Sequence, residues 1–288
     1  MSLLSQVVLI TGASRGLGRA VARRLADDGA SLVLAARNEP ELAAAGRDLV
    51  ESGLAPGQQV ICMQVDVTCG EDVERLVDRA LGLTGRLDVL VCNAGVYGPL
   101  GLLEDVAWEE WVDAIHINLM GTVLCCRGVV PAMRRQGAGK IILLSGGGAT
   151  QPLPRLSAYA ASKAAVVRFG ETLAEEVKDA GIAVNVVAPG SLNTRLLAQV
   201  LEAGPERVGR EFYDRAVRQS ETGGTPLDIP ADLIAFLAST ASDGVTGRLL
   251  SAVWDDWRGL PALRDQLAGS DVYTLRRIVP EDRGWSMP

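Results

Sequence analysis

The chain reads Val7-Val8-Leu9-Ile10-Thr11-Gly12-Ala13-Ser14-Arg15-Gly16-Leu17-Gly18 near its N-terminus, an apolar run that leads into a glycine-rich turn. Residues 17–28 then have the apolar spacing of a helix. A strand, a glycine-rich turn and a helix in this order predict a helix N-terminus that holds the phosphates of a dinucleotide. The G-x-x-x-G-x-G spacing, with no Lys-Ser/Thr pair after it, argues against a nucleoside triphosphate loop. The alternative is a strand-to-helix turn that binds nothing.

Strand-like and helix-like patterns alternate along the rest of the chain. The expected strands cover 6–10, 31–35, 59–65, 87–91, 140–145, 182–187 and 248–253. The expected helices cover 17–28, 39–52, 70–83, 108–135, 157–180 and 230–240. This alternation predicts an α/β fold with a doubly wound, seven-stranded, mostly parallel sheet of the Rossmann type and helices on both faces. Ligands of such sheets bind at the carboxyl ends of the strands.

A second pattern, Tyr159-Ala160-Ala161-Ser162-Lys163, lies in the expected helix 157–180. Residues four apart share one face of a helix, so the two polar side chains are neighbours. An ammonium group beside a phenol favours phenolate and would lower the pKa of Tyr159 toward neutrality. The pair is therefore a candidate acid/base unit. A tyrosine and a lysine on a solvated helix face are the alternative.

Composition restricts the function classes. The chain has 288 residues, enough for one α/β domain, and 48% are apolar but only 4% aromatic, which predicts an aliphatic core. A net charge of −7 argues against nucleic acid and anionic membranes as partners. Five cysteines lack metal-ligand spacing and indicate reduced thiols in a cytoplasmic protein, with no metal. No signal peptide is expected before Gln6, and no apolar run approaches the ~18 residues of a membrane span.

The two motifs, taken with four others, resemble the short-chain dehydrogenase/reductase family. The others are Asp66-Val67, Asn93-Ala94-Gly95, Asn118, and Pro189-Gly190 with Thr194, and the resemblance runs from about Gln6 to Val253. It implies a single dinucleotide-binding and catalytic domain over residues 1–253, with a substrate lid at about 191–229. Residues 254–288 would then be an extension packed on the domain or on a neighbouring subunit. Trp254 and Trp257 indicate that this extension is ordered.

The resemblance also implies roles for these residues. Tyr159 would donate a proton to a carbonyl or accept one from an alcohol, Lys163 would lower its pKa and hold the nicotinamide ribose, and Asn118 would bind a relay water. The expected cofactor-binding residues are Gly12, Ser14, Arg15, Gly16, Leu17, Gly18, Arg37, Asp66, Val67, Asn93, Ala94, Gly95, Tyr159, Lys163, Pro189, Gly190 and Thr194.

The end of the second strand indicates which cofactor is used. A site that prefers NAD(H) places a carboxylate there for the ribose 2′-hydroxyl, but this chain has Ala36. Arg37 follows, and Arg15 lies in the glycine turn. Guanidinium groups suit a 2′-phosphate, so the sequence predicts NADP(H) in preference to NAD(H). Two exposed arginines without such a role are the alternative.

One expected residue is missing. The family usually has a serine thirteen residues before the tyrosine, and counting back from Tyr159 gives Gly146. Ser145 is one position early, and one step along a strand reverses the direction of the side chain. Three possibilities stay open: the glycine run Gly146-Gly147-Gly148 takes over the serine's role through backbone N–H groups, a nearby hydroxyl of Thr150 or Ser157 does so, or Ser145 serves as the catalytic serine.

The sequence therefore predicts an NADP(H)-dependent oxidoreductase that interconverts a ketone or aldehyde and a secondary alcohol by hydride transfer. Its partners would be a small-molecule substrate and further copies of the chain, as a dimer or tetramer. Two other functions stay open: a catalytically weak NADP(H)-binding sensor or scaffold, and a sugar epimerase or dehydratase.

Overall fold

The expected strands form one seven-stranded sheet within residues 2–285, the part of the chain that the computed structural model describes. The strands are β1 (Val7–Thr11), β2 (Ser31–Ala36), β3 (Val60–Gln64), β4 (Val89–Cys92), β5 (Gly139–Leu144), β6 (Ile182–Ala188) and β7 (Arg248–Ser251). Their order is β3-β2-β1-β4-β5-β6-β7, and every neighbouring pair is parallel. The prediction of a doubly wound α/β sheet is confirmed, and the sheet is wholly rather than mostly parallel.

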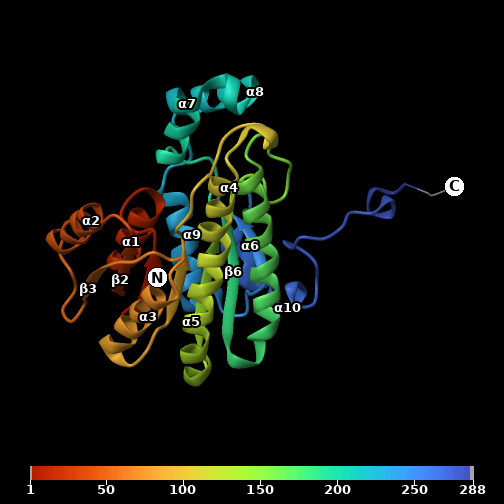
Figure 1. Ribbon diagram of the computed structural model, residues 1–288. Helices are drawn as coiled ribbons and strands as arrows, with labels where there is room; N and C mark the ends of the chain where they lie inside the picture. Colours follow the sequence, from red (N-terminus) through yellow and green to blue (C-terminus); the bar gives the residue numbers. More distant parts are fainter. Residues whose placement is uncertain (1, 286–288) are drawn as a thin grey trace.

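Helices connect the strands and cover both faces (Figure 1). They are α1 (Gly16–Asp27), α2 (Glu39–Glu51), α3 (Gly70–Thr84), α4 (Trp108–Ile115), α5 (Gly121–Gln136), α6 (Ser157–Glu176), α7 (Arg195–Val208), α8 (Arg210–Thr222), α9 (Asp228–Ala238) and α10 (Arg264–Leu267). Short helical turns are η1 (Leu103–Asp105), η2 (His116–Met120), η3 (Lys178–Ala180), η4 (Thr240–Ser242), η5 (Trp257–Leu263) and η6 (Pro280–Arg283).

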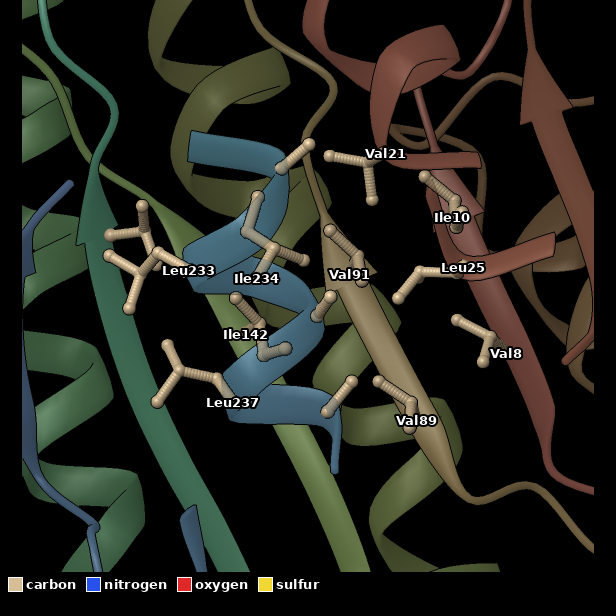
Figure 2. Packing of buried hydrophobic residues seen from close by; sticks show 14 of the residues in the cluster. Val8, Ile10, Val21, Leu25, Val89, Val91, Ile142, Leu233, Ile234 and Leu237 are labelled. Carbon is tan, nitrogen blue, oxygen red and sulfur yellow. The ribbon is translucent and has the colours of Figure 1, made fainter. Parts of the chain in front are cut away.

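Each face of the sheet has its own aliphatic core. On one face, Val21 and Leu25 of α1 and Leu233, Ile234 and Leu237 of α9 pack on the central strands (Figure 2). On the other face, side chains of α3, α5 and α6 pack on the same strands. Because the central strands are buried on both sides, they read as continuous apolar runs in the sequence.

Residues 191–229 form the helical pair α7 and α8, which lies above the carboxyl ends of the strands (Figure 1). Gly204, with φ +74°, kinks α7, and Gly209 with φ +85° joins the two helices. Apolar residues of the pair form a small third core with Tyr97 and Leu100 from the loop after β4. The pair is therefore attached to that loop rather than to the main cores.

The extension after β7 contacts the body through residues 257–275. Trp257 is buried against Phe236 of α9 with a ring-centroid distance of 5.3 Å, and Leu260 and Leu267 are buried beside it. The backbone N–H of Leu249 donates to Tyr273 O at 2.8 Å, so the extension covers the outer edge of β7. Trp254 is exposed.

Beyond Leu275 the extension points away from the body (Figure 1). Arg276 binds the carboxylate of Asp282 through Nη1 at 2.6 Å and Nη2 at 2.9 Å, which organises the turn η6. Residues 286–288 of the extension lie outside the described part of the chain.

The continuous helical stretch Trp108–Gln136 is long enough and apolar enough to cross a membrane by length and composition alone. It is not an uninterrupted apolar run, because charged residues such as Asp113 and Arg127 lie within it. Cys125, Cys126, Val129 and Met133 are buried in the core under α5, which accounts for much of its apolar character.

Candidate active site

The carboxyl ends of β1 and β4 lie side by side, at the point where the strand order reverses. Thr11 Oγ1 accepts hydrogen bonds from the backbone N–H groups of Asn93 and Ala94, each at 3.1 Å. Asn93 Nδ2 donates in return to Thr11 O at 3.0 Å and Gly12 O at 2.9 Å. The side chain of Asn93 thus fixes the glycine turn, and such switch points are where open α/β sheets bind ligands.

The glycine turn is too tightly packed for side chains. A Cβ on Gly18 would lie 2.2 Å from Gly12 O, and one on Gly12 would lie 2.8 Å from Ala94 Cα. Gly16 has φ +53°, and a Cβ on Gly16 would lie 3.4 Å from Thr194 Cγ2. No side chain caps the first turn of α1, and that turn carries no acidic residue. The residues therefore fit a dinucleotide, whose pyrophosphate would meet uncapped N–H groups at the positive end of α1.

Charged side chains lie at the outer end of this turn. Arg15 Nη1 is 3.4 Å from Glu41 Oε2, and Ser14 Oγ is also 3.4 Å from that oxygen. Asp66 Oδ1 accepts from Thr68 N at 2.9 Å and Thr68 Oγ1 at 2.8 Å. Burial opposes the charge on Asp66, but these bonds and the charge of Arg37 hold its pKa below the usual value. Asp66 is thus an ionised acceptor.

Other expected cofactor residues are buried in the cores or lie close to the catalytic candidates and the strand ends. Leu17 and Val67 are buried in the two main cores. A Cβ on Gly95 would lie 3.2 Å from Asn118 Oδ1 and 3.5 Å from Lys163 Nζ, so this glycine adjoins the catalytic candidates. Pro189 and Gly190 follow β6, and Thr194 caps α7 through a bond from Leu196 N at 3.4 Å.

Tyr159 and Lys163 lie on the buried face of α6. Lys163 Nζ donates to Leu144 O at 2.8 Å and lies 5.8 Å from the centre of the Tyr159 ring. Burial lowers the pKa of Lys163 to about 8. Burial, with Tyr97 as a smaller contribution, raises the pKa of Tyr159 above its usual value. The expectation that Lys163 lowers this pKa is wrong for the present geometry, because Lys163 bonds to the backbone of β5 and desolvation outweighs its charge.

Asn118 is fully buried in the π-helical turn η2. Its Oδ1 accepts from Val96 N at 2.8 Å, and its Nδ2 donates to Val96 O at 2.8 Å and to Ser162 Oγ at 2.9 Å. The side chain thus clamps the loop after β4 to α6. Both N–H donors of the Asn118 side chain are thus used within the protein, and its backbone carbonyl accepts from Thr122 Oγ1 at 2.8 Å. The relay-water role of Asn118 stays a prediction.

Gly146 faces the hydroxyl of Tyr159. A Cβ on Gly146 would lie 2.0 Å from Tyr159 Oη, so the phenol fills the space that a serine side chain would need. Ser145 Oγ is buried and has no hydrogen-bond partner among the described residues, and the backbone N–H of Ser145 donates to Val187 O at 2.8 Å. Gly146 therefore occupies the position that faces the phenol.

Some contacts of the site were not foreseen. The ring of Tyr97 packs edge-on against Tyr159 with centroids 4.7 Å apart and an interplanar angle of 86°. Tyr97 also packs in the small core formed by α7 and α8, so it connects these helices to Tyr159. Ser162, inside the tyrosine–lysine motif, supports Asn118. Tyr97 and Glu41 carry no spacing signal, since their contacts join distant segments.

Comparison with known proteins agrees with this geometry. A family model described as short chain dehydrogenase matches residues 6–204. The chain belongs to the short-chain dehydrogenase/reductase family. Dehydrogenase/reductase SDR family member 4 of Sus scrofa is 36% identical over 245 residues, which is 85% of this chain and 85% of that protein.

Solved structures of this family are similar over most of the chain. One is an actinorhodin polyketide ketoreductase with NADPH, with a TM-score of 0.78 and 31% identity over 87% of this chain and 97% of that one. Another is an NAD⁺-bound xylitol dehydrogenase, with a TM-score of 0.78 and 27% identity over 87% and 98%. Members that resemble this chain thus use either nicotinamide cofactor, and the family supports an oxidoreductase acting on a small molecule.

Proposed function

We propose that this chain is an NADP(H)-dependent oxidoreductase that interconverts a ketone or aldehyde with the corresponding alcohol. The observation that best supports it is the cluster of Tyr159, Lys163 and Asn118 beside Gly95, at the same strand ends as the glycine turn. A raised pKa keeps the phenol of Tyr159 protonated at neutral pH, which suits a proton donor to a carbonyl oxygen.

The remaining residues bind and orient. A bound nicotinamide would supply or accept the hydride. Lys163 has three N–H donors and gives one to Leu144 O, so its others are available for ribose hydroxyls. Gly12, Gly16 and Gly18 would hold the pyrophosphate, Asp66 the adenine, and Pro189, Gly190 and Thr194 the carboxamide. Tyr97 and the lid helices would exclude water.

NADP(H) is the proposed preference. Ala36 at the end of β2 offers no carboxylate to a ribose hydroxyl, and Arg15 and Arg37 offer guanidinium groups near it. We also propose a cytoplasmic homo-oligomer, a dimer or tetramer, which light scattering after size exclusion would test.

A panel of carbonyl compounds and alcohols, followed by NADPH absorbance, tests the activity. It should include an aromatic polyketide-like ketone and a polyol, the substrate types of the two structural relatives named above. Turnover of at least one compound supports the proposal. Tight NADPH binding with no turnover of any compound would favour the sensor or scaffold. Conversion of a nucleotide sugar without net redox change would favour the epimerase.

A further inference from the structure

Glu41 lies against the two polar side chains of the glycine turn. Arg15 Nη1 is 3.4 Å from both carboxylate oxygens, and Ser14 Oγ is 3.4 Å from Oε2. The backbone N–H of Glu41 donates to Asn38 Oδ1 at 3.1 Å, which caps α2. The first turn of α2 thus holds an acid against the turn that would receive the adenosine ribose.

A carboxylate here competes with a phosphate for the same donors. Both are anionic acceptors that an arginine binds, and they repel each other at short range. Within residues 2–285, Glu41 is the acid that contacts Arg15. The side chains of Arg15 and Glu41 are 52% and 38% exposed, and a partly exposed ion pair of this length is weak enough to be displaced.

We propose that Glu41 is a specificity-determining residue that limits the preference for NADP(H). It binds Arg15 in the free protein, so a 2′-phosphate must displace it and then lie beside it. A ribose hydroxyl carries no charge, so NAD(H) leaves the pair in place. The inference rests on the proposed nicotinamide-dependent function and concerns the adenosine end of that site.

The test is a pair of dissociation constants, for NADPH and for NADH, measured by nucleotide fluorescence. Glu41→Gln is expected to tighten NADPH binding about tenfold, because the repulsion ends and Arg15 is released. NADH binding should change less than about threefold, since the ribose hydroxyls carry no charge. Glu39→Gln is the matched control, because it removes the same charge from the same turn of α2. It should change neither constant more than about threefold, since an exposed charge without close contact is screened.

A double-mutant cycle locates the effect. In an Arg15→Ala background, Glu41→Gln should change NADPH binding less than about threefold, because the coupled partner is absent. An unchanged NADPH-to-NADH ratio in Glu41→Gln would overturn the inference. Equal effects of Glu39→Gln and Glu41→Gln would overturn it too, since they would show a general charge effect. So would weaker NADH binding in Glu41→Gln, because Glu41 would then bind the ribose hydroxyls.

The unmodified protein separates this inference from the proposed function. Binding of neither nucleotide would refute both. Preference for NADH in the unmodified protein, with the expected shift in Glu41→Gln, would refute only the proposed NADP(H) preference. Preference for NADPH with no shift would refute only the role of Glu41.

Discussion

Gly146 stands where the family pattern has a serine, and the phenol of Tyr159 fills the space that a serine side chain would need. The count along the sequence singled out Gly146, and the structure places Gly146 against the phenol of Tyr159. The position of the phenol could not be predicted, since it depends on α6 and on Tyr97 from another loop. The backbone N–H groups of Gly147 and Gly148, the next two residues in the sequence, remain candidates to donate to the substrate oxygen in place of a serine hydroxyl.

Ser145→Ala is expected to keep kcat/KM within about tenfold of the parent, a change below ~1.4 kcal/mol. Ser145 Oγ has no hydrogen-bond partner among the described residues, so its removal breaks no hydrogen bond there. Steady-state kinetics with the best substrate of the panel would measure this. A loss as deep as that of Tyr159→Phe would instead identify Ser145 as the catalytic serine.

Lys163 gives the cofactor-free protein a pH-dependent stability. Burial lowers its pKa to about 8 in the folded protein, against an ordinary lysine value of 10.5. Below pH 8 the lysine is protonated in both the folded and unfolded states, and its burial penalty is constant. Between pH 8 and 10.5 only the unfolded state keeps the proton, so this group makes stability rise with pH.

The melting temperature of the parent, relative to that of Lys163→Met, is therefore expected to rise from pH 8 to pH 9.5. The comparison removes contributions of other groups, because both proteins share them. Thermal unfolding across this range provides the measurement. A difference that stays constant or falls would show that Lys163 is not deprotonated on folding in this window.

The segment 191–229 is the part of the fold for which the sequence predicted no secondary structure. Its mixed apolar and charged residues broke the strand–helix alternation, yet they form α7 and α8. The apolar side chains of these helices pack against each other and against Tyr97. Contacts of this kind join distant segments, so no local sequence pattern reveals them. The strands, by contrast, were predicted within two residues, because strands buried on both faces carry their own apolar signal.

Arg155 fastens the lid to the loop before α6. Arg155 Nη1 donates to Glu206 O at 2.7 Å and to Arg207 O at 3.2 Å, near the carboxyl end of α7. Its φ of +68° is unusual for a residue other than glycine, so the surrounding contacts hold a strained backbone in place. These charge-assisted bonds to helix-end carbonyls hold the end of α7 against the loop before α6.

Arg155→Ala is expected to raise KM for the substrate about three- to tenfold with a smaller change in kcat. A lost charge-assisted bond costs on the order of 1.5–3 kcal/mol, and rearrangement of α7 and α8 would recover part of that cost. Limited proteolysis of residues 195–222 should also become faster. Arg195→Ala is the control, because this exposed arginine of α7 makes no side-chain hydrogen bond or ion pair within residues 2–285. Equal KM values and equal proteolysis rates in the parent and in Arg155→Ala would show that Arg155 does not hold α7 and α8 in place.

At the scale of the whole molecule, the C-terminal extension completes the fold at the β7 edge. Arg248 donates to Ser270 O at 2.9 Å, to Val272 O at 2.6 Å and to Leu267 O. The N–H of Leu275 donates to Glu171 Oε1 at 2.6 Å. Trp254 and Trp257 suggested an ordered extension, but their burial differs, since Trp257 is packed and Trp254 is exposed.

Truncation after Val253 is expected to lower the melting temperature by more than about 5 °C, because each large apolar side chain lost from the core is worth roughly 1.5–3 kcal/mol. Truncation after Leu275 is the matched control. It removes only the outlying arm and should shift the melting temperature by less than about 2 °C, since exposed residues contribute little. Equal melting temperatures for the parent and the shorter form would show that residues 257–275 do not stabilise the domain.

The proposed interconversion of a carbonyl compound and an alcohol depends on Tyr159 as the proton donor, and Tyr159→Phe tests this role most directly. The variant keeps the ring that packs against Tyr97 and loses only the hydroxyl beside Gly146. General acid catalysis is worth roughly 10²–10⁴ in rate, so kcat should fall by at least about a hundredfold. NADPH binding, measured by fluorescence in the same preparation, should stay within about threefold, because the hydroxyl is not needed for the pyrophosphate site. A variant that binds NADPH normally and keeps more than about a tenth of kcat would contradict the central claim.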